Sequence, residues 1–392
     1  MESGELVRRH AVVALLFCLL PAFIPAQANP PGFDEVVSQA AKARDQDNVA
    51  QAIELYRRAV ELKPDWPDGW WYLGSLQYEA EAYAAGTEAL SRYLELVPNA
   101  APAWALRGLS EFETGDYTQS LTDIQRGLSL GAGKEPREEK VLRYHEALLL
   151  TRRGNFEGAL QEYAKLAHGK VPNPEVLVAI GLAGLRTPLL PRDLKADKRD
   201  LYLAAGNAAF LFLSADQTAA QQAFQDLFQR FPTAANAHYL YGILLSRADP
   251  GQSLKEFKRE VEINPANAAA EVMVAWESLM HNDPVTALAY AEKANAQEPT
   301  LPGIPLVLGR ALVETGDVKR GTEVLEKQLQ LEPDNIEIRF ALVKAYSKSG
   351  RKEDARQQRL LCLQMEKSPA SRNLANRDLA GPDSAVHDSA AQ

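Results

Sequence analysis

The sequence predicts an all-α protein, a right-handed α-solenoid in which stacked helix–turn–helix units form a concave groove. The first sign is a regular series of prolines, which are Pro64 and Pro98, then Pro232, Pro265, Pro299 and Pro333. Within each of these two groups the spacing is 33 or 34 residues, and a fixed period of this size indicates a repeat architecture. Each proline closes an amphipathic run such as AIELYRRAVELKP, in which apolar residues return at three- and four-residue steps. That spacing predicts helices, and proline ends them because its nitrogen has no hydrogen to donate.

A second apolar run precedes each of these runs and carries a small residue near its middle. The glycines at this place are Gly74, Gly108, Gly242 and Gly309. Glycine inside a helix costs about 1 kcal/mol relative to alanine, so its recurrence predicts a site where another helix approaches closely. Short turns should separate the paired helices, and the sequence offers Gly115-Asp116, Gly154-Asn155 and Gly316-Asp317.

This pattern resembles the tetratricopeptide repeat family, whose signature is W-x2-L-G-x2-Y, then A-x3-F, then P. One unit matches with Trp70, Leu73, Gly74 and Pro98, although Gln77 stands where the signature has tyrosine. We assign the structural repeat signature to Trp70, Leu73, Gly74, Trp104, Gly108, Gly242 and Gly309. The resemblance covers roughly residues 33–367. It implies that the first helices of the units line the groove and that peptides or partner helices bind there.

The phased series divides the chain into units. We expect them to begin near Phe33, Pro67, Ala101, Lys140, Pro174, Leu201, Ala235, Ala268 (give or take two positions), Pro302 and Ile336. The predicted organisation is a signal peptide (1–28), an N-terminal array of about four repeats (29–172), a degenerate repeat or irregular connection (173–200), a C-terminal array of about five repeats (201–367) and a disordered tail (368–392). The tail lacks apolar periodicity, which is why disorder is expected there.

The stretch from Pro174 to Asp200 departs from the period. PEVLVAIGLAGLR reads as a first helix, but TPLLPRDLKADKRD, where the second helix should lie, contains two prolines and many charges. This segment is either a hinge or partner-docking loop, or a degenerate repeat tolerated within a long array. We favour the degenerate repeat.

The N-terminal segment 1–28 predicts export. Arg8 and Arg9 precede an apolar run from Ala11 to Ile24, and Ala26-Gln27-Ala28 follows as a cleavage site. This is the plan of a secretory signal peptide, so the mature chain should begin at Asn29 and be periplasmic or extracellular. The alternative is an uncleaved anchor. No later run is long enough to cross a bilayer, so we expect no membrane span in the mature chain.

Composition and motifs argue against catalysis and against a nucleic-acid partner. The net charge is −9 and the sequence pI about 5.4, whereas nucleic-acid binders carry a concentrated basic face. His145-Glu146 begins like the zinc motif H-E-x-x-H, but Leu149 stands where the second histidine must be. The predicted mature chain keeps one cysteine, Cys362, which cannot form an internal disulfide. We therefore expect no catalytic residues, no metal site and no cofactor.

The remaining functional candidates are aromatic residues one step further round the first helices than the signature positions. By this phasing the predicted partner-binding residues in the groove are Trp71, Tyr78, Phe112, Phe212 and Tyr239. Exposed aromatic rings are typical binding anchors because they give a large contact area with few rotatable bonds. The alternative for each is that it fills the core between repeats.

The sequence thus predicts a non-enzymatic scaffold of exported bacterial type, which binds a peptide, helix or partner protein in its groove in the periplasm or cell envelope. Some relatives grip a C-terminal carboxylate with basic groove residues, but the corresponding places here are apolar, so that clamp is absent. Those places hold Val37, Ala41, Tyr72, Pro102 and Leu106. Two alternatives stay open: a carbohydrate- or polymer-handling envelope scaffold, and a self-assembling structural module that forms homo-oligomers.

Overall fold

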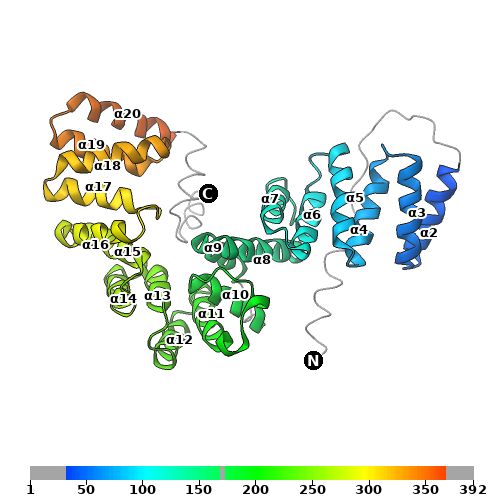
Figure 1. Ribbon diagram of the computed structural model, residues 1–392, viewed down its shortest axis with the longest axis horizontal. Helices are drawn as coiled ribbons and strands as arrows, with labels where there is room; N and C mark the ends of the chain where they lie inside the picture. The colour runs from blue at the N-terminus through cyan, green and yellow to red at the C-terminus, as the bar shows by residue number, and fades with distance from the viewer. Residues whose placement is uncertain (1–31, 168–172, 368–392) are drawn as a thin grey trace, which may run out of the picture. The chain divides into compact units, whose positions relative to one another are not determined.

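A computed structural model describes residues 32–167 and 173–367 (Figure 1). The predicted signal peptide and the predicted tail lie outside the described residues. Within the described ranges the chain forms α-helices, two short 3-10 turns and no strand. The predicted all-α repeat solenoid is therefore confirmed. None of the helices in these ranges is long and apolar enough to cross a membrane.

The described residues divide into two units. The first unit contains residues up to 167 together with 187–190, and the second contains 173–186 and 191–367. The helices of the first unit are α2 (Phe33–Asp45), α3 (Val49–Leu62), α4 (Pro67–Glu79), α5 (Tyr83–Leu96), α6 (Ala101–Thr114), α7 (Tyr117–Ser129), α8 (Pro136–Arg153) and α9 (Phe156–Leu166). They pack as four successive hairpins, α2–α3, α4–α5, α6–α7 and α8–α9.

The second unit begins with α10, a helix that has no second helix of its own, and continues with five hairpins. Its helices are α10 (Pro174–Gly184), α11 (Arg199–Leu213), α12 (Gln217–Arg230), α13 (Ala237–Leu245), α14 (Pro250–Ile263), α15 (Ala268–Met280), α16 (Pro284–Gln297), α17 (Ile304–Thr315), α18 (Val318–Leu331), α19 (Ile336–Lys348) and α20 (Lys352–Lys367). Figure 1 shows α17 beside α18 and α19 beside α20. We call α11, α13, α15, α17 and α19 the first helices of this unit.

The helix–helix turns form as the Gly-Asp and Gly-Asn pairs predict. Gly115, Gly154 and Gly316 end their helices with φ of 88°, 85° and 102°, the left-handed region that glycine adopts without strain. Asp116 and Asp317 then cap the next helix, each side chain accepting a hydrogen bond from the backbone N–H three positions on. One dipeptide thus both ends the first helix and starts the second.

The predicted close approach between paired helices is also present. A Cβ atom added at Gly74, Gly108 or Gly309 would lie 2.7, 2.8 or 2.5 Å from the side chain of Leu90, Ile124 or Leu325, respectively. Each of these partners is on the second helix of the same hairpin. Gly242 repeats the arrangement against the ring of Phe257, where the added Cβ would be 2.6 Å from Cε1. Glycine recurs here because no side chain fits.

The signature tryptophans Trp70 and Trp104 each form a hydrogen bond to the proline that precedes their hairpin. The indole N–H of Trp70 donates to the carbonyl oxygen of Pro64 at 2.8 Å, and that of Trp104 donates to Pro98 at 2.8 Å. The two tryptophans are one repeat period apart, as are the two prolines, so the same bond is made in consecutive repeats.

The irregular stretch contains two 3-10 turns, Pro191–Asp193 and Ala196–Lys198, where a second helix was expected. In its absence α10 packs directly against α11 at two glycines. A Cβ at Gly181 would lie 1.9 Å from the carbonyl oxygen of Tyr202, and one at Gly206 would lie 1.7 Å from that of Leu177. Whether this segment is a hinge, a docking loop or only a degenerate repeat stays a prediction.

The paired-helix contact gives a stability prediction. Gly108→Ala places a Cβ 2.9 Å from the backbone nitrogen of Ile124 and 3.0 Å from the carbonyl oxygen of Ser120. Backbone atoms cannot move aside cheaply, so the free energy of unfolding should fall by about 1–3 kcal/mol, measured by urea denaturation followed by circular dichroism.

Gly251→Ala is the matched control, because the added Cβ meets only an Asp249 carboxylate oxygen at the ordinary distance of 3.6 Å. It should change the free energy of unfolding by less than about 0.5 kcal/mol. Equal losses in the two variants would contradict the close-approach explanation.

Candidate functional site

A cavity of about 250 Å³ lies on the first helices of the second unit. Three successive first helices, α15, α17 and α19, contribute its walls, and α17 contacts both of the others. The lining residues are Trp276, Arg310, Val313, Glu314, Glu337, Phe340, Ala341 and Lys344. This cavity is the candidate functional site.

Three of the lining residues occupy the same position in consecutive repeats. Trp276, Arg310 and Lys344 follow one another at the repeat period. The repeat therefore aligns an aromatic ring, a guanidinium and an ammonium on neighbouring first helices. Sequence reasoning did not assign this site, although the periodic spacing of these three residues was a signal that could have found it.

Arg310 is the central polar group. Its guanidinium carbon lies 4.9 Å from the centre of the Trp276 ring, a cation–π contact. Arg310 makes no hydrogen bond or ion pair with any residue that the structure describes. Burial lowers the pKa of Arg310, and the negative charges of Glu337 and Glu314 act against that shift. A partly buried cation thus faces the cavity with its N–H donors unused by the described residues.

Glu337 supplies the complementary unpaired group. Its Oε2 atom is buried and accepts no hydrogen bond from the described part of the chain. Burial raises the pKa of Glu337, and the positive charge of Arg310 opposes the rise. The two groups are therefore close enough to influence each other, although they do not form an ion pair.

The other charges of the cavity neutralise one another. Glu314 Oε1 forms an ion pair with Lys344, and its Oε2 lies 3.1 Å from Nζ of Lys348. Burial would raise the pKa of Glu314, but the hydrogen bonds from the two lysines outweigh it and leave the pKa below its usual value. Arg310 and Glu337 are the unpaired charges that remain among the lining residues.

Phe340 gives the cavity an exposed apolar wall. It is 48% exposed, whereas Val313 and Ala341 beside it are buried. An aromatic ring left open at the rim, next to an unpaired arginine, combines two residue types that are common at binding hot spots or in recognition pockets.

The aromatic residues predicted for partner binding lie elsewhere. Trp71, Tyr78 and Phe212 are half-buried. Trp71 packs against Tyr93 with ring centres 5.6 Å apart, and Tyr78 packs against Tyr83 at 5.5 Å. None of these residues lines the cavity. Partner contact by any of the three stays a prediction.

Phe112 and Tyr239 do not present the exposed rings that the phasing predicted, because each is only 6% exposed. The edge of Phe112 meets His145 with ring centres 4.8 Å apart. Tyr239 packs against Phe257 at 5.7 Å. These contacts come from neighbouring helices, so both rings fill the core between elements, which was the alternative interpretation.

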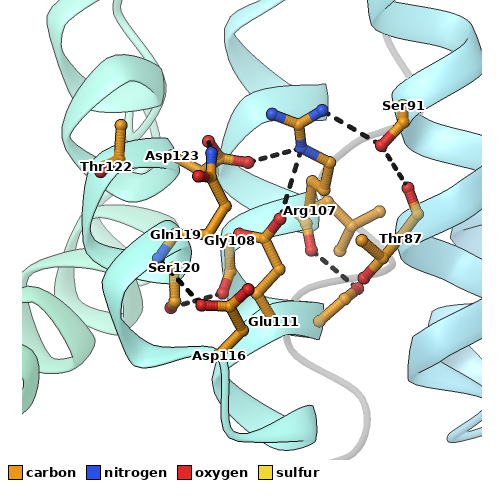
Figure 2. Close-up of polar contacts among 12 residues, drawn as sticks. Thr87, Ser91, Arg107, Gly108, Glu111, Asp116, Gln119, Ser120, Thr122 and Asp123 are labelled. Atoms are coloured by element: carbon orange, nitrogen blue, oxygen red, sulfur yellow. Dashed lines mark hydrogen bonds and ion pairs between the residues drawn. The ribbon is translucent and has the colours of Figure 1, made fainter.

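A second polar cluster lies inside the first unit (Figure 2). Arg107 on α6 donates to Asp123 on α7 at 2.5 Å and to Ser91 on α5 at 3.1 Å, and it lies 3.6 Å from Glu111. Asp123 is fully buried and Glu111 nearly so. The cluster therefore joins three helices, α5, α6 and α7. The described ranges also contain no group of three or more His, Cys, Asp or Glu side chains that could hold a metal ion.

Comparisons with known proteins agree with the repeat geometry. A tetratricopeptide repeat family model matches residues 39–101, and a second one matches residues 316–358. With the hairpin fold, these matches support a tetratricopeptide repeat protein. No curated protein matches the chain. Proteins of this family generally mediate protein–protein interaction and are typically non-enzymatic.

Solved structures that match the chain share little sequence with it. The Cut9–Hcn1 hetero-tetramer of APC/C has 12% identity and a TM-score of 0.34, with 85% of this chain and 66% of that chain covered. A tetratricopeptide repeat protein from Parabacteroides merdae has 14% identity and a TM-score of 0.31, with 72% and 99% covered. Yeast Tom70 has 13% identity and a TM-score of 0.33, with 89% and 92% covered.

The internal cluster gives a pH prediction. Burial and the nearby charge of Asp123 raise the pKa of Glu111 to about 8, and Arg107 opposes the rise. The folded state therefore holds the proton more tightly than the unfolded chain, whose carboxyl has a pKa near 4.5. The stabilisation is complete below the unfolded pKa and is lost as the pH rises through the folded value. The contribution of Glu111 to the free energy of unfolding should thus fall between pH 4.5 and 8, by at most about 1.4 kcal/mol per pH unit.

Glu111→Gln should make the free energy of unfolding fall less steeply with pH, because the amide cannot ionise. Other buried carboxyls with a raised pKa, such as Glu337, keep their own contributions. The measurement is urea denaturation at several pH values across that range. Glu88→Gln, at an exposed position on α5, is the control and should retain the wild-type slope. If Glu111→Gln retained the same slope, the pH dependence would come from other groups.

Proposed function

We propose that the protein is a non-enzymatic scaffold that binds a partner protein through the cavity on α15, α17 and α19. The observation that carries this proposal is Arg310, a partly buried cation that lines a cavity and has no hydrogen bond or ion pair with the described residues. Family membership supports the general class of function. The unpaired groups of the cavity support this location for the proposed contact.

Burial of a charged group without a hydrogen-bond partner is energetically unfavourable. A partly desolvated guanidinium without a partner lowers stability, and an apolar residue of similar length would avoid that cost. A partner that brings an acceptor to Arg310 would recover the lost hydrogen bonds. Arginine and large aromatic residues also dominate the energetics of protein interfaces. Arg310, Trp276 and Phe340 place these types together on one face.

The cavity is suited to part of a polypeptide better than to a large cofactor. Pockets for drug-sized ligands are about 300–1,000 Å³. A cavity of about 250 Å³ is below that range and accommodates one or two side chains. Its mixture of apolar wall and single charged groups also resembles a pocket for an anchoring side chain.

The proposed place of action is the periplasm or cell envelope, after export directed by residues 1–28. This rests on the basic, apolar and small-residue order of that segment, with Ala26-Gln27-Ala28 as the cleavage site. Mass spectrometry of the protein recovered from the producing cell should give a chain that begins at Asn29. A retained N-terminal segment in that preparation would instead support the anchor.

Partner binding is tested by in-cell crosslinking followed by affinity capture. Arg310→Met removes the unpaired cation, and Phe340→Ala removes the exposed ring. Each should reduce capture of the partner by about tenfold or more, the loss typical of a hot-spot residue. The two matched controls remove a cation and a large apolar side chain from exposed positions on second helices. They are Arg259→Met on α14 and Leu331→Ala on α18.

Thermal unfolding separates a binding defect from misfolding. Arg310→Met should unfold at the same temperature as the wild type or at a higher one, because it removes a partly desolvated charge that has no hydrogen bond or ion pair with the described residues. If the site variants capture the same proteins as the controls, the cavity is not the binding surface. A lowered unfolding temperature in Arg310→Met would instead show that Arg310 stabilises the fold.

A further inference from the structure

We propose that the cavity on α15, α17 and α19 recognises a carboxamide side chain, glutamine or asparagine, of the protein partner. This inference deepens the proposed function and rests on it. Two polar groups that line the cavity have no hydrogen bond or ion pair with the described residues: the guanidinium of Arg310 and the carboxylate of Glu337, whose Oε2 atom is itself buried.

One occupant of the cavity can meet both groups, because both line it. Both line the same cavity, and the charge of each affects the other. They form no hydrogen bond or ion pair with one another or with the rest of the described chain. An occupant that meets both must accept a hydrogen bond from Arg310 and donate one to Glu337.

The chemistry of common side chains decides between occupants. A carboxylate accepts from Arg310, but it has no proton to donate and brings a second negative charge beside Glu337. A lysine or arginine donates to Glu337, but it brings a positive charge beside Arg310. A carboxamide has a carbonyl oxygen that accepts and an NH2 group that donates, on two separate atoms and without net charge. It satisfies both groups at once.

The other walls favour an amide carried on an apolar stem. Trp276, Val313, Phe340 and Ala341 line the cavity around the two polar groups. The methylene groups of a glutamine can lie against these residues while its amide reaches Arg310 and Glu337. Glu314 does not compete for the occupant, because its oxygens are paired with Lys344 and Lys348.

Trp276 provides a reporter for occupancy. The sequence has five tryptophans, and the other four lie between Trp66 and Trp104. In protein labelled with 15N-tryptophan, one indole N–H signal therefore comes from the second unit. A Trp276→Phe variant assigns that signal by its loss.

The probes are peptides of the form acetyl-Leu-Xaa-Leu-N-methylamide, with glutamine, glutamate, lysine, serine or norleucine at Xaa. Titrations are run on the full chain at pH 8, well above the usual range of a carboxyl group, because burial raises the pKa of Glu337. The glutamine peptide should shift the Trp276 signal in a saturable way. Its Kd should be lower than that of the other four peptides by roughly tenfold. The glutamate, lysine and norleucine peptides leave Arg310 or Glu337 without a hydrogen bond. The serine peptide must donate and accept through one oxygen atom, whereas the amide uses two separate atoms.

The decisive variant is Glu337→Gln, which keeps the shape and removes the negative charge. The remaining carboxylate near Arg310 is then Glu314, which is already paired with Lys344 and Lys348, and the new amide can donate. The preference should therefore reverse, so that the glutamate peptide binds more tightly than the glutamine peptide. A residue with only a structural role would not reverse specificity. An unchanged circular dichroism spectrum and unfolding temperature confirm that this variant is folded.

Three results would overturn the inference: no saturable shift with the glutamine peptide, equal or tighter binding of the glutamate or serine peptide to wild type, or no reversal in Glu337→Gln. These results are distinguishable from failure of the proposed function. If capture of the partner still depends on Arg310 and Phe340 while the amide preference is absent, the cavity binds a partner by other chemistry.

Discussion

The close contact between the two helices of each hairpin is the constraint on which the rest of the structure depends. At Gly74, Gly108 and Gly309 an added Cβ would come within 2.8 Å of a side chain on the second helix. Interiors packed this tightly do not absorb even one extra methyl group without strain. The contact fixes how the two helices of a hairpin lie against each other. Repetition of the contact fixes which face of each first helix is turned toward its neighbours.

The cavity follows from that repetition. Because the sequence keeps its period through this part of the chain, Trp276, Arg310 and Lys344 fall at one position on three first helices that pack in order. The position follows directly after the small-residue site at Gly309, so it is turned away from the helix–helix contact by about 100°. Residues there can be large, as Trp276, Arg310 and Lys344 are. They can also carry unpaired charge, as Arg310 does.

The sequence was sufficient to predict the hairpins, the turns and the packing positions, because each of these depends on local chemistry. Gly115-Asp116 ends one helix and caps the next whatever surrounds it, and Gly108 excludes a side chain because of its own partner helix. Helical phase did not determine exposure. Phe112 and Tyr239 have the predicted phase, but His145 and Phe257 cover them from neighbouring helices. Such coverage depends on contacts between helices, which a single periodic pattern does not contain.

The sequence did not predict the cavity, because its distinguishing feature is that two charged side chains lack a hydrogen bond or ion pair. Arg310 and Glu337 look like ordinary surface charges in the sequence, and only the packing shows that both are partly buried and unpaired within the described chain.

The most direct measurement is site-specific photocrosslinking in the producing cell, with a photoreactive phenylalanine analogue in place of Phe340 or, as a control, of Leu331. The account predicts that the Phe340 position captures one partner and the Leu331 position does not. Equal capture from both positions, or capture from Leu331 alone, would contradict it.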